Sequence, residues 1–257
     1  MSMERLTLVV DIGRMQTLRG QRVVVIGGTS GMGRGAARAA AEASAEVVVA
    51  GRRPPGARAP EAWKDQVTEV VVDVTDERAV RDLFQGIGKL DHLLVTATPP
   101  ASPRPFLEQD EATARSFLDG KLFGSLACAR HAAPRMRSGG SITFLTGCAA
   151  IRPRPGLSMV TATFAALEAI SQALALELGP LRVNTIRPGL VDSEMWSFLD
   201  DRAREQLRAK VRAAFPARRI GSVEDIGHAA VFLMTNPYVT GTVLEVSGGE
   251  PLVSLDL

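Results

Sequence analysis

A glycine-rich run, Gly27–Gly33, has the residue types and spacing that suit phosphate binding. It follows an apolar run rich in β-branched residues, Arg22–Ile26, and precedes an alanine-rich segment with helical character. Glycines in such a turn let the backbone approach a pyrophosphate, which the N-terminus of the following helix stabilises. Because a plain turn does not require three spaced glycines, the run predicts a dinucleotide site. The predicted lining residues are Gly27, Thr29, Ser30, Gly31, Met32 and Gly33.

The residues after the second apolar run, Glu46–Ala50, indicate which dinucleotide binds. NAD sites place an acidic residue there for the ribose hydroxyls, whereas this chain has Arg52 and Arg53. A guanidinium suits a 2′-phosphate, so we expect NADP(H) as the cofactor. The alternative is a solvated arginine pair. Asp73 and Val74, which follow the third apolar run, are expected beside the adenine.

Apolar runs and helical patterns alternate along the chain. The predicted strands are Arg22–Ile26, Glu46–Ala50, Glu69–Val72, Asp91–Thr96, Ser141–Thr146, Arg182–Ile186 and Thr242–Val246. The predicted helices that follow the glycine run's own helix are Glu77–Ile87, Glu108–Arg137, Met159–Leu178, Asp201–Phe215 and Val223–Leu233. This alternation predicts a doubly wound Rossmann fold of the α/β class. We expect a seven-stranded, mainly parallel sheet flanked by helices in a single domain.

Length and composition limit the other classes of function. A chain of 257 residues fits one α/β domain, here 18–257, preceded by an extension over residues 1–17. The formal net charge is +2, which argues against nucleic-acid binding. Cys128 and Cys148 lack metal-ligand spacing and are expected to be small buried thiols. We expect a cytoplasmic protein with no bound metal, no membrane span and a small-molecule substrate.

From about residue 18 onward the chain resembles the short-chain dehydrogenase/reductase family. The resemblance rests on the glycine run, Asp73, the RVNTIRPG run ending at Pro188 and Gly189, and the YVTGTVLEVSGG run over 238–249. It implies a nicotinamide cofactor whose carboxamide is contacted by the residues after the Pro-Gly turn. The cofactor positions that the resemblance adds are Thr96, Ala97, Pro188, Gly189, Val191 and Ser193. Thr96 and Ala97 belong to a Val-Thr-Ala-Thr run that departs from the family's usual Asn-Asn-Ala-Gly.

The positions that carry proton transfer in the family hold other residues here. Val160 stands where the tyrosine belongs, and Phe164 stands where the lysine four residues later belongs. Gly147 replaces the serine and Lys121 replaces the asparagine. The single tyrosine, Tyr238, lies in the C-terminal run, where we expect a structural role. The sequence therefore predicts an atypical member that has lost all four of these groups.

Two residues are candidates for the missing chemistry. An ammonium at Lys121 would lie beside an apolar wall, which lowers its pKa toward a useful general-acid range. The alternative is that Lys121 turns outward and pairs with an acidic residue. Thr146 flanks the lost serine and serves either in catalysis or only in packing. Other polar residues at the predicted site are Cys148, Thr161, Thr163, Asp192 and Glu194.

A segment of about residues 190–218 is expected to form a lid over the nicotinamide and to exclude water from an apolar pocket. The apolar residues of this lid are Met195, Trp196, Phe198, Leu199, Leu207 and Phe215.

Three alternative functions are compatible with the predicted cofactor site, the missing proton-transfer groups and the apolar lid. The first is a ketone/alcohol oxidoreductase for a bulky apolar substrate with a non-standard proton route. The second is a non-redox isomerase, dehydratase or cyclase, and the third is a non-catalytic NADP(H)-binding protein.

Two long predicted helices also indicate self-association. In proteins of this family the counterparts of Glu108–Arg137 and Met159–Leu178 form a four-helix interface, so we expect a homodimer or homotetramer. The residues expected at this interface are Leu118, Leu122, Leu126, Ala166, Ile170 and Leu174.

Overall fold

A computed structural model describes residues 17–52, 67–101, 103–194 and 200–253. Seven strands form one sheet, in the order β3-β2-β1-β4-β5-β6-β7, and every neighbouring pair is parallel. The strands are β1 (Arg22–Ile26), β2 (Glu46–Gly51), β3 (Val67–Val71), β4 (Leu90–Val95), β5 (Met136–Leu145), β6 (Arg182–Pro188) and β7 (Val243–Val246). The strand order reverses between β1 and β4, where open α/β sheets bind their ligands. This confirms the predicted doubly wound fold and its single domain.

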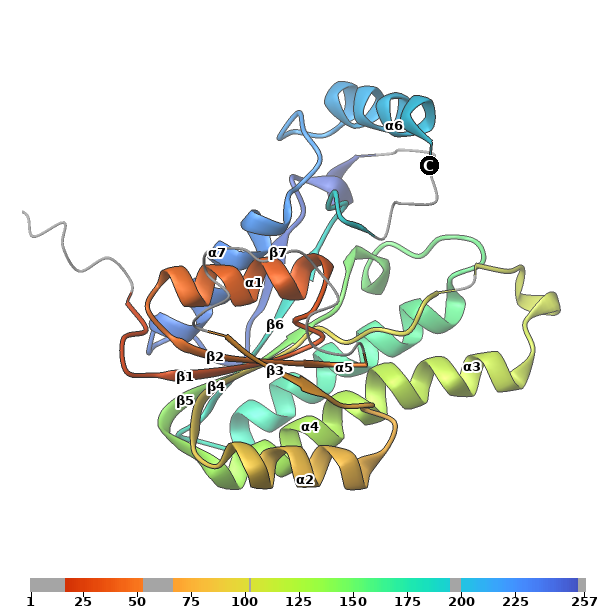
Figure 1. Cartoon of the computed structure of the whole chain (residues 1–257). Helices are drawn as coiled ribbons and strands as arrows, with labels where there is room; N and C mark the ends of the chain where they lie inside the picture. The colour runs from red at the N-terminus through yellow and green to blue at the C-terminus, as the bar shows by residue number, and fades with distance from the viewer. Residues whose placement is uncertain (1–16, 53–66, 102, 195–199, 254–257) are drawn as a thin grey trace, which may run out of the picture.

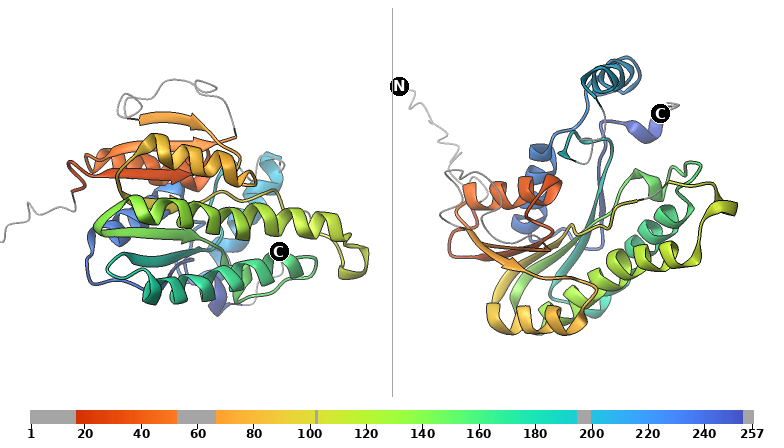
Figure 2. Two further views of the ribbon diagram at one scale, coloured as in Figure 1. Left: turned by 90° about the horizontal axis from the view of Figure 1, so that it is seen from below. Right: turned by 45° about the vertical axis from the view of Figure 1, so that its right-hand side comes forward.

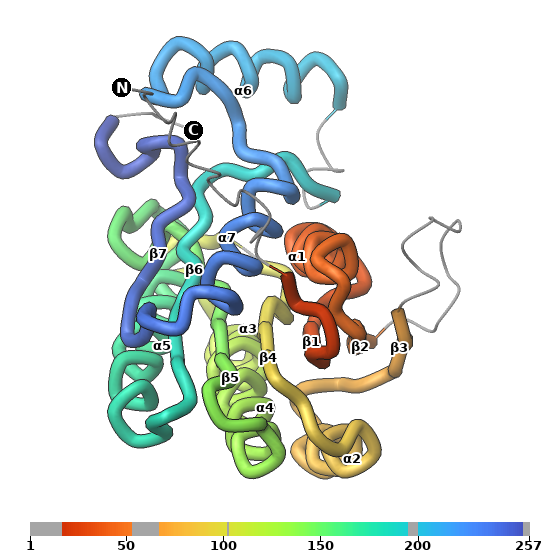
Figure 3. The backbone as a smooth tube through the Cα atoms, turned by 90° about the vertical axis from the view of Figure 1, so that its left-hand side faces the viewer, coloured from red at the N-terminus to blue at the C-terminus, as the bar shows by residue number. Residues whose placement is uncertain are grey.

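Helices cover both faces of the sheet (Figures 1 and 3). On one face lie α1 (Gly31–Glu42) and α7 (Val223–Thr235), and their side chains share a core with Val23, Val25 and Val47. On the other face lie α2 (Glu77–Ile87), α4 (Gly124–Ala132) and α5 (Ser158–Glu177). Because both faces are covered, β1 and β2 are apolar at successive positions after their first residue rather than alternating.

The long helix predicted over Glu108–Arg137 is broken. It consists of α3 (Glu111–Leu118), a π-helical turn over Asp119–Phe123, α4 and a 3-10 turn, and strand β5 already begins at Met136. The π turn lies where the loop after β4 presses on the helix: a Cβ at Gly120 would come within 2.4 Å of Pro99 Cγ. Single π turns inside α-helices occur frequently at functional sites.

The structure describes residues 190–194 and 200–218 of the predicted lid, whose role over the nicotinamide stays a prediction. Helix α6 (Asp201–Ala214) is mostly exposed and stands away from the sheet, as Figure 2 shows. Phe215 is buried at its end and packs toward Gly248, so it anchors the helix to the body of the protein. Met195, Trp196, Phe198 and Leu199 lie outside the described residues, as do residues 1–16 of the predicted extension.

Helix α5 is long and apolar enough to cross a membrane by length and composition alone. Its inner side, however, is buried against the sheet through Phe164, Leu167 and Ser171. A helix of this composition is also what a buried crossover of an α/β fold requires.

Candidate functional site

The glycine run forms a tight cradle between β1 and α1. Gly27 and Gly31 have φ angles of 85° and 52°, which favour glycine. A Cβ at Gly33 would lie 2.3 Å from the Gly27 carbonyl oxygen, and one at Gly27 would lie 2.6 Å from the Ala97 nitrogen. Above Gly31, by contrast, the nearest atom to such a Cβ is Ser193 Cβ at 3.9 Å. The cradle therefore keeps helix and strand in close contact and leaves room for a pyrophosphate, as a dinucleotide site requires.

The remaining residues of the run fit this geometry. Ser30 is the N-cap of α1, in extended conformation, and its side chain makes no capping hydrogen bond. A Cβ at Gly51, the last residue of β2, would lie 3.0 Å from Thr29 Oγ1, so the two turns touch. Met32 is half-buried and packs on the core.

The adenosine end of the predicted site lies at the carboxyl ends of β2 and β3. Arg52 follows β2 directly and is exposed, whereas Arg53 lies outside the described residues. The carboxylate of Asp73 accepts hydrogen bonds from the Thr75 backbone N–H at 3.0 Å and from the Thr75 hydroxyl at 2.8 Å. These bonds lower the pKa of Asp73. Val74 packs closely on Gly124, the first residue of α4, because a Cβ at Gly124 would lie 2.7 Å from Val74 Cγ2. Helix α4 is therefore in direct contact with this loop.

The nicotinamide end of the predicted site lies where β4 and β6 end. Thr96 Oγ1 donates to the Ile26 carbonyl at 3.0 Å, and the Ala97 N–H donates to the same carbonyl at 3.1 Å. On the other side, Pro188 ends β6 and the Gly189 N–H donates to the Val246 carbonyl at 3.0 Å. Val191 forms a β-bridge with Gly221, and Ser193 faces the Gly31 turn. The structure thus brings the predicted cofactor residues of both halves to one edge of the sheet.

A buried carboxylate that we did not predict holds the start of this second loop. Glu250 accepts a hydrogen bond from the Leu190 backbone N–H at 2.8 Å and pairs with Arg154 at 2.6 Å. Burial raises its pKa. It connects the C-terminal turn to the loop between β5 and α5 and to the residue after Gly189.

Phe164 and Gly147 are complementary in shape. A Cβ at Gly147 would lie 3.0 Å from Phe164 Cε2, so the aromatic ring occupies the space that a serine side chain would need. The Phe117 and Phe164 ring centroids lie 6.4 Å apart, which extends the apolar wall toward α3. The replacements at the lysine and serine positions, Phe164 and Gly147, are therefore packed together as an apolar contact rather than as part of a proton-transfer site.

Lys121 points into the protein, and the outward alternative is wrong. Its side chain is fully buried in the π turn, and Nζ donates to the Ala97 carbonyl at 3.1 Å. Nζ also lies 5.9 Å from the centroid of the Phe164 ring. Burial lowers the pKa of Lys121 to about 7. One of the three N–H donors of the Lys121 ammonium therefore bonds the backbone of the loop that follows β4.

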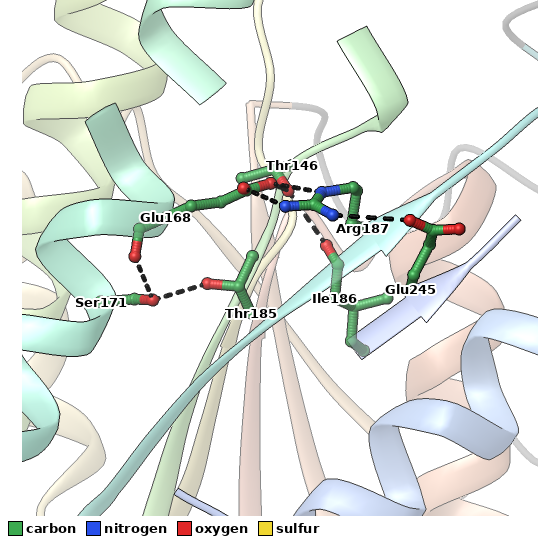
Figure 4. A network of polar contacts seen from close by, with 7 residues as sticks. All are labelled: Thr146, Glu168, Ser171, Thr185, Ile186, Arg187 and Glu245. Carbon is green, nitrogen blue, oxygen red and sulfur yellow. Dashed lines mark hydrogen bonds and ion pairs between the residues drawn. The ribbon is translucent and has the colours of Figure 1, made fainter. Parts of the chain in front are cut away.

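Thr146 is buried, and its hydroxyl donates to Glu168 Oε1 at 2.8 Å. Figure 4 shows the polar network to which this contact belongs. Since its hydrogen is engaged by a carboxylate, the Thr146 hydroxyl offers a ligand only a hydrogen-bond acceptor. Sequence reasoning did not single out Glu168, although it is the one charged residue in the apolar stretch 155–176 and is buried.

Of the other polar candidates, Thr163, Asp192 and Glu194 have partners within the fold, whereas the buried Thr161 hydroxyl has no hydrogen-bond partner in the part of the chain that the structure describes. Cys128 and Cys148 are free and buried, as predicted, and burial raises the pKa of each thiol to about 12. The Thr163 hydroxyl donates to the Met159 carbonyl, and Asp192 pairs with Arg208 at 2.6 Å. The Tyr238 side chain is almost completely exposed, so it does not supply a phenol to the site. The described residues hold no group of three His, Cys, Asp or Glu side chains placed to bind a metal.

The fold and this edge of the sheet define a dinucleotide-binding α/β protein of the kind that serves hydride-transfer enzymes. Comparisons with known proteins agree. Residues 27–250 match the family model described as enoyl-(acyl carrier protein) reductase. The chain is 30% identical to the short-chain dehydrogenase/reductase ATR9 of Stachybotrys chlorohalonatus, over 91% of this chain and 98% of that one. This chain therefore belongs to the short-chain dehydrogenase/reductase family.

Solved structures show the same architecture. A small-chain dehydrogenase in complex with NADPH is 30% identical, covers 90% of this chain and 99% of its own, and superposes with a TM-score of 0.75. The reductase/Diels–Alderase MalC of Malbranchea aurantiaca is also 30% identical, with coverages of 91% and 98% and a TM-score of 0.84.

Proposed function

We propose that this protein is an NADP(H)-dependent oxidoreductase that interconverts a ketone and an alcohol on a bulky apolar substrate. The observation that carries the proposal is the intact glycine cradle combined with an exposed Arg52 at the end of β2. Arg52 supplies a cation for a 2′-phosphate. The similarity to a dehydrogenase described in complex with NADPH supports the same cofactor. When bound, the cofactor supplies the hydride.

The protein's own contribution is orientation and a proton. The Gly27 and Gly33 turn holds the phosphates, and the loops containing Ala97, Val191 and Ser193 orient the nicotinamide. Phe164 and Val160 form an apolar wall that excludes water and favours an apolar substrate.

We assign the proton to Lys121. Burial lowers the pKa of Lys121 to about 7, and general acids work best when their pKa lies near the operating pH. Nζ is completely buried, so contact with a substrate oxygen requires the Phe164 ring to move or a water molecule to relay the proton.

A titration and an assay test this proposal. NADPH binding is measured first, and NADPH absorbance is then followed with a panel of bulky ketones. In Lys121→Met, which keeps much of the volume and removes the amine, turnover should fall by about 10²–10⁴ while NADPH affinity is retained. Turnover within about threefold of the wild type would exclude Lys121 as the acid.

A non-redox cyclase or isomerase is the second candidate. Its supporting observation is that apolar residues, Gly147, Val160 and Phe164, stand at three of the family's proton-transfer positions, and that the Phe164 ring fills the space beside Gly147. The relative MalC is described as both a reductase and a Diels–Alderase. NADPH binding without oxidation by any ketone of the panel, together with conversion of an unsaturated substrate at constant NADPH, would favour this candidate.

A further inference from the structure

A buried ion pair links α5 to β6 beside the candidate site. Arg187 Nε donates to Glu168 Oε1 at 3.0 Å, and Nη2 donates to Oε2 at 2.5 Å. The two side chains are only 14% and 10% exposed. This fork-to-fork arrangement fixes direction as well as distance, because both oxygens of the carboxylate face the planar guanidinium (Figure 4).

The same carboxylate also holds the end of β5. Thr146 Oγ1 donates to Glu168 Oε1 at 2.8 Å. A second contact runs parallel to it: the Thr185 hydroxyl donates to Ser171 Oγ at 2.8 Å, and Ser171 donates to the Glu168 carbonyl at 2.9 Å. One residue of α5 thus collects hydrogen bonds from the carboxyl ends of two neighbouring strands.

Glu168 and the two residues that donate to its carboxylate lie close in sequence to predicted site residues. Arg187 immediately precedes Pro188 and Gly189, from which the loop continues to the predicted carboxamide contacts. Thr146 immediately precedes Gly147, and Phe164 lies one helical turn before Glu168. The residues at 147, 160 and 164 are apolar. In the described part of the chain, the polar side-chain contact between the end of β5 and α5 is therefore the hydrogen bond from Thr146 to the Glu168 carboxylate.

We propose that Glu168 is a positioning residue for the nicotinamide end of the cofactor site. Both oxygens of its carboxylate are engaged by Arg187 and Thr146, so it acts through these residues rather than on the cofactor or substrate directly. Its carboxylate holds the exit of β6, and with it the Pro188–Ser193 loop, in register with α5 and β5. The inference rests on the proposed function in one respect, namely that a nicotinamide dinucleotide binds at this edge.

The network also indicates what happens when the carboxylate is lost. Arg187 Nη1 already lies 3.5 Å from Glu245 Oε2 on β7, and the Glu245 side chain is about one-third exposed. A buried guanidinium without its partner is costly, so Arg187 turns toward Glu245 and draws the exit of β6 outward. The Gly27–Gly33 cradle and Arg52 lie on the other half of the sheet and remain in place.

The test compares two ligands. The probes are NADPH and adenosine 2′,5′-bisphosphate, which contains the adenosine end and the 2′-phosphate but no nicotinamide. In Glu168→Gln, NADPH affinity should fall at least tenfold, whereas affinity for the bisphosphate should stay within twofold of the wild type. Arg187→Lys keeps the charge, loses the fork and should show an intermediate loss for NADPH alone.

Asp91→Asn is the matched control. The Asp91 side chain is 14% exposed and pairs with Arg137 at 2.6 Å, but it lies near the amino end of β4, at the opposite edge of the sheet. This variant should lose stability toward urea, as Glu168→Gln does, and yet bind both ligands normally. If it loses NADPH affinity equally, or if Glu168→Gln loses affinity for both ligands alike, the positioning role is wrong.

Two further results are decisive. Unchanged NADPH affinity in both Glu168→Gln and Arg187→Lys would overturn the inference while leaving the proposed function intact. Absence of NADPH binding by the wild-type protein would overturn the proposed cofactor and the inference with it. Should Glu168→Gln fail to fold, Arg187→Lys carries the same comparison.

Discussion

Replacing Lys121 by methionine should change how the stability of the protein depends on pH. In the unfolded chain the amine binds a proton below pH 10.5, whereas in the folded protein burial lowers its pKa to about 7. Between these values the unfolded state holds one more proton, so the free energy of unfolding rises with pH. Below pH 7 the folded protein bears the full cost of a buried ammonium.

The size of the effect follows from the two pKa values. A fall from 10.5 to about 7 corresponds to about 5 kcal/mol, at about 1.36 kcal/mol for each tenfold change in proton affinity. Between pH 7 and pH 9 the wild type should therefore gain about 2 kcal/mol relative to Lys121→Met.

Urea unfolding at intervals from pH 6 to pH 9 measures this difference. Both proteins contain the two buried thiols, so their titration cancels when one curve is subtracted from the other. Lys89→Met, which removes an exposed lysine, should run parallel to the wild type. Parallel curves for the wild type and Lys121→Met would refute the reasoning, because they would mean that the amine keeps its ordinary pKa in the fold.

Four further changes have defined outcomes. Gly147→Ser should lose about 1–3 kcal/mol in urea unfolding because its Cβ meets Phe164 at 3.0 Å, and Phe164→Leu in the same chain should restore most of that loss; equal losses with and without the second change would contradict this. Arg52→Ala should weaken NADPH but not NADH, since a charged hydrogen bond contributes about 1.5–3 kcal/mol, and equal weakening measured by titration would remove the 2′-phosphate assignment. Ile170→Glu, on the half-buried outer side of α5, should convert a dimer or tetramer into monomers by light scattering, an expectation that fails if the wild type is already monomeric. His92, buried with a pKa of about 4, binds a proton more readily when unfolded, so stability should fall by about 3 kcal/mol from pH 6.5 to pH 4 and this slope should flatten in His92→Gln.

Strands and the glycine cradle were predictable from the sequence because both depend on local patterns. All seven predicted strands are present, with ends that differ by a few residues at most except for β5, whose observed start at Met136 was assigned to a helix. That helix looked continuous because its apolar pattern continues through Asp119–Phe123. The π turn there depends on how closely Pro99 packs on Gly120, which no pattern within the helix records.

Contacts between distant residues explain what the sequence left open at the site. A lysine is ordinarily exposed, so the inward direction of Lys121 follows only from the assembled pocket of Ala97 and Phe164. The pairing of Glu168 with Arg187 likewise requires α5 to lie on β6 in one register. Leu122 and Leu174, two of the residues expected at a subunit interface, are half-buried and pack against the protein's own core. The neighbouring Phe123, which was not among the expected interface residues, is the exposed apolar side chain of that turn.

The fit between Phe164 and Gly147 also restricts the order in which this centre can be altered. While the ring occupies its present place, any side chain at position 147 enters filled space, so a serine is tolerated there only after residue 164 has become smaller or has turned away. Changing Phe164 first, however, removes the aromatic face beside the buried Lys121 amine. An engineer who wished to rebuild a serine–tyrosine–lysine centre in this chain would therefore have to change positions 147, 160 and 164 together, and Lys121 with them, because each replacement made alone gives a less stable protein.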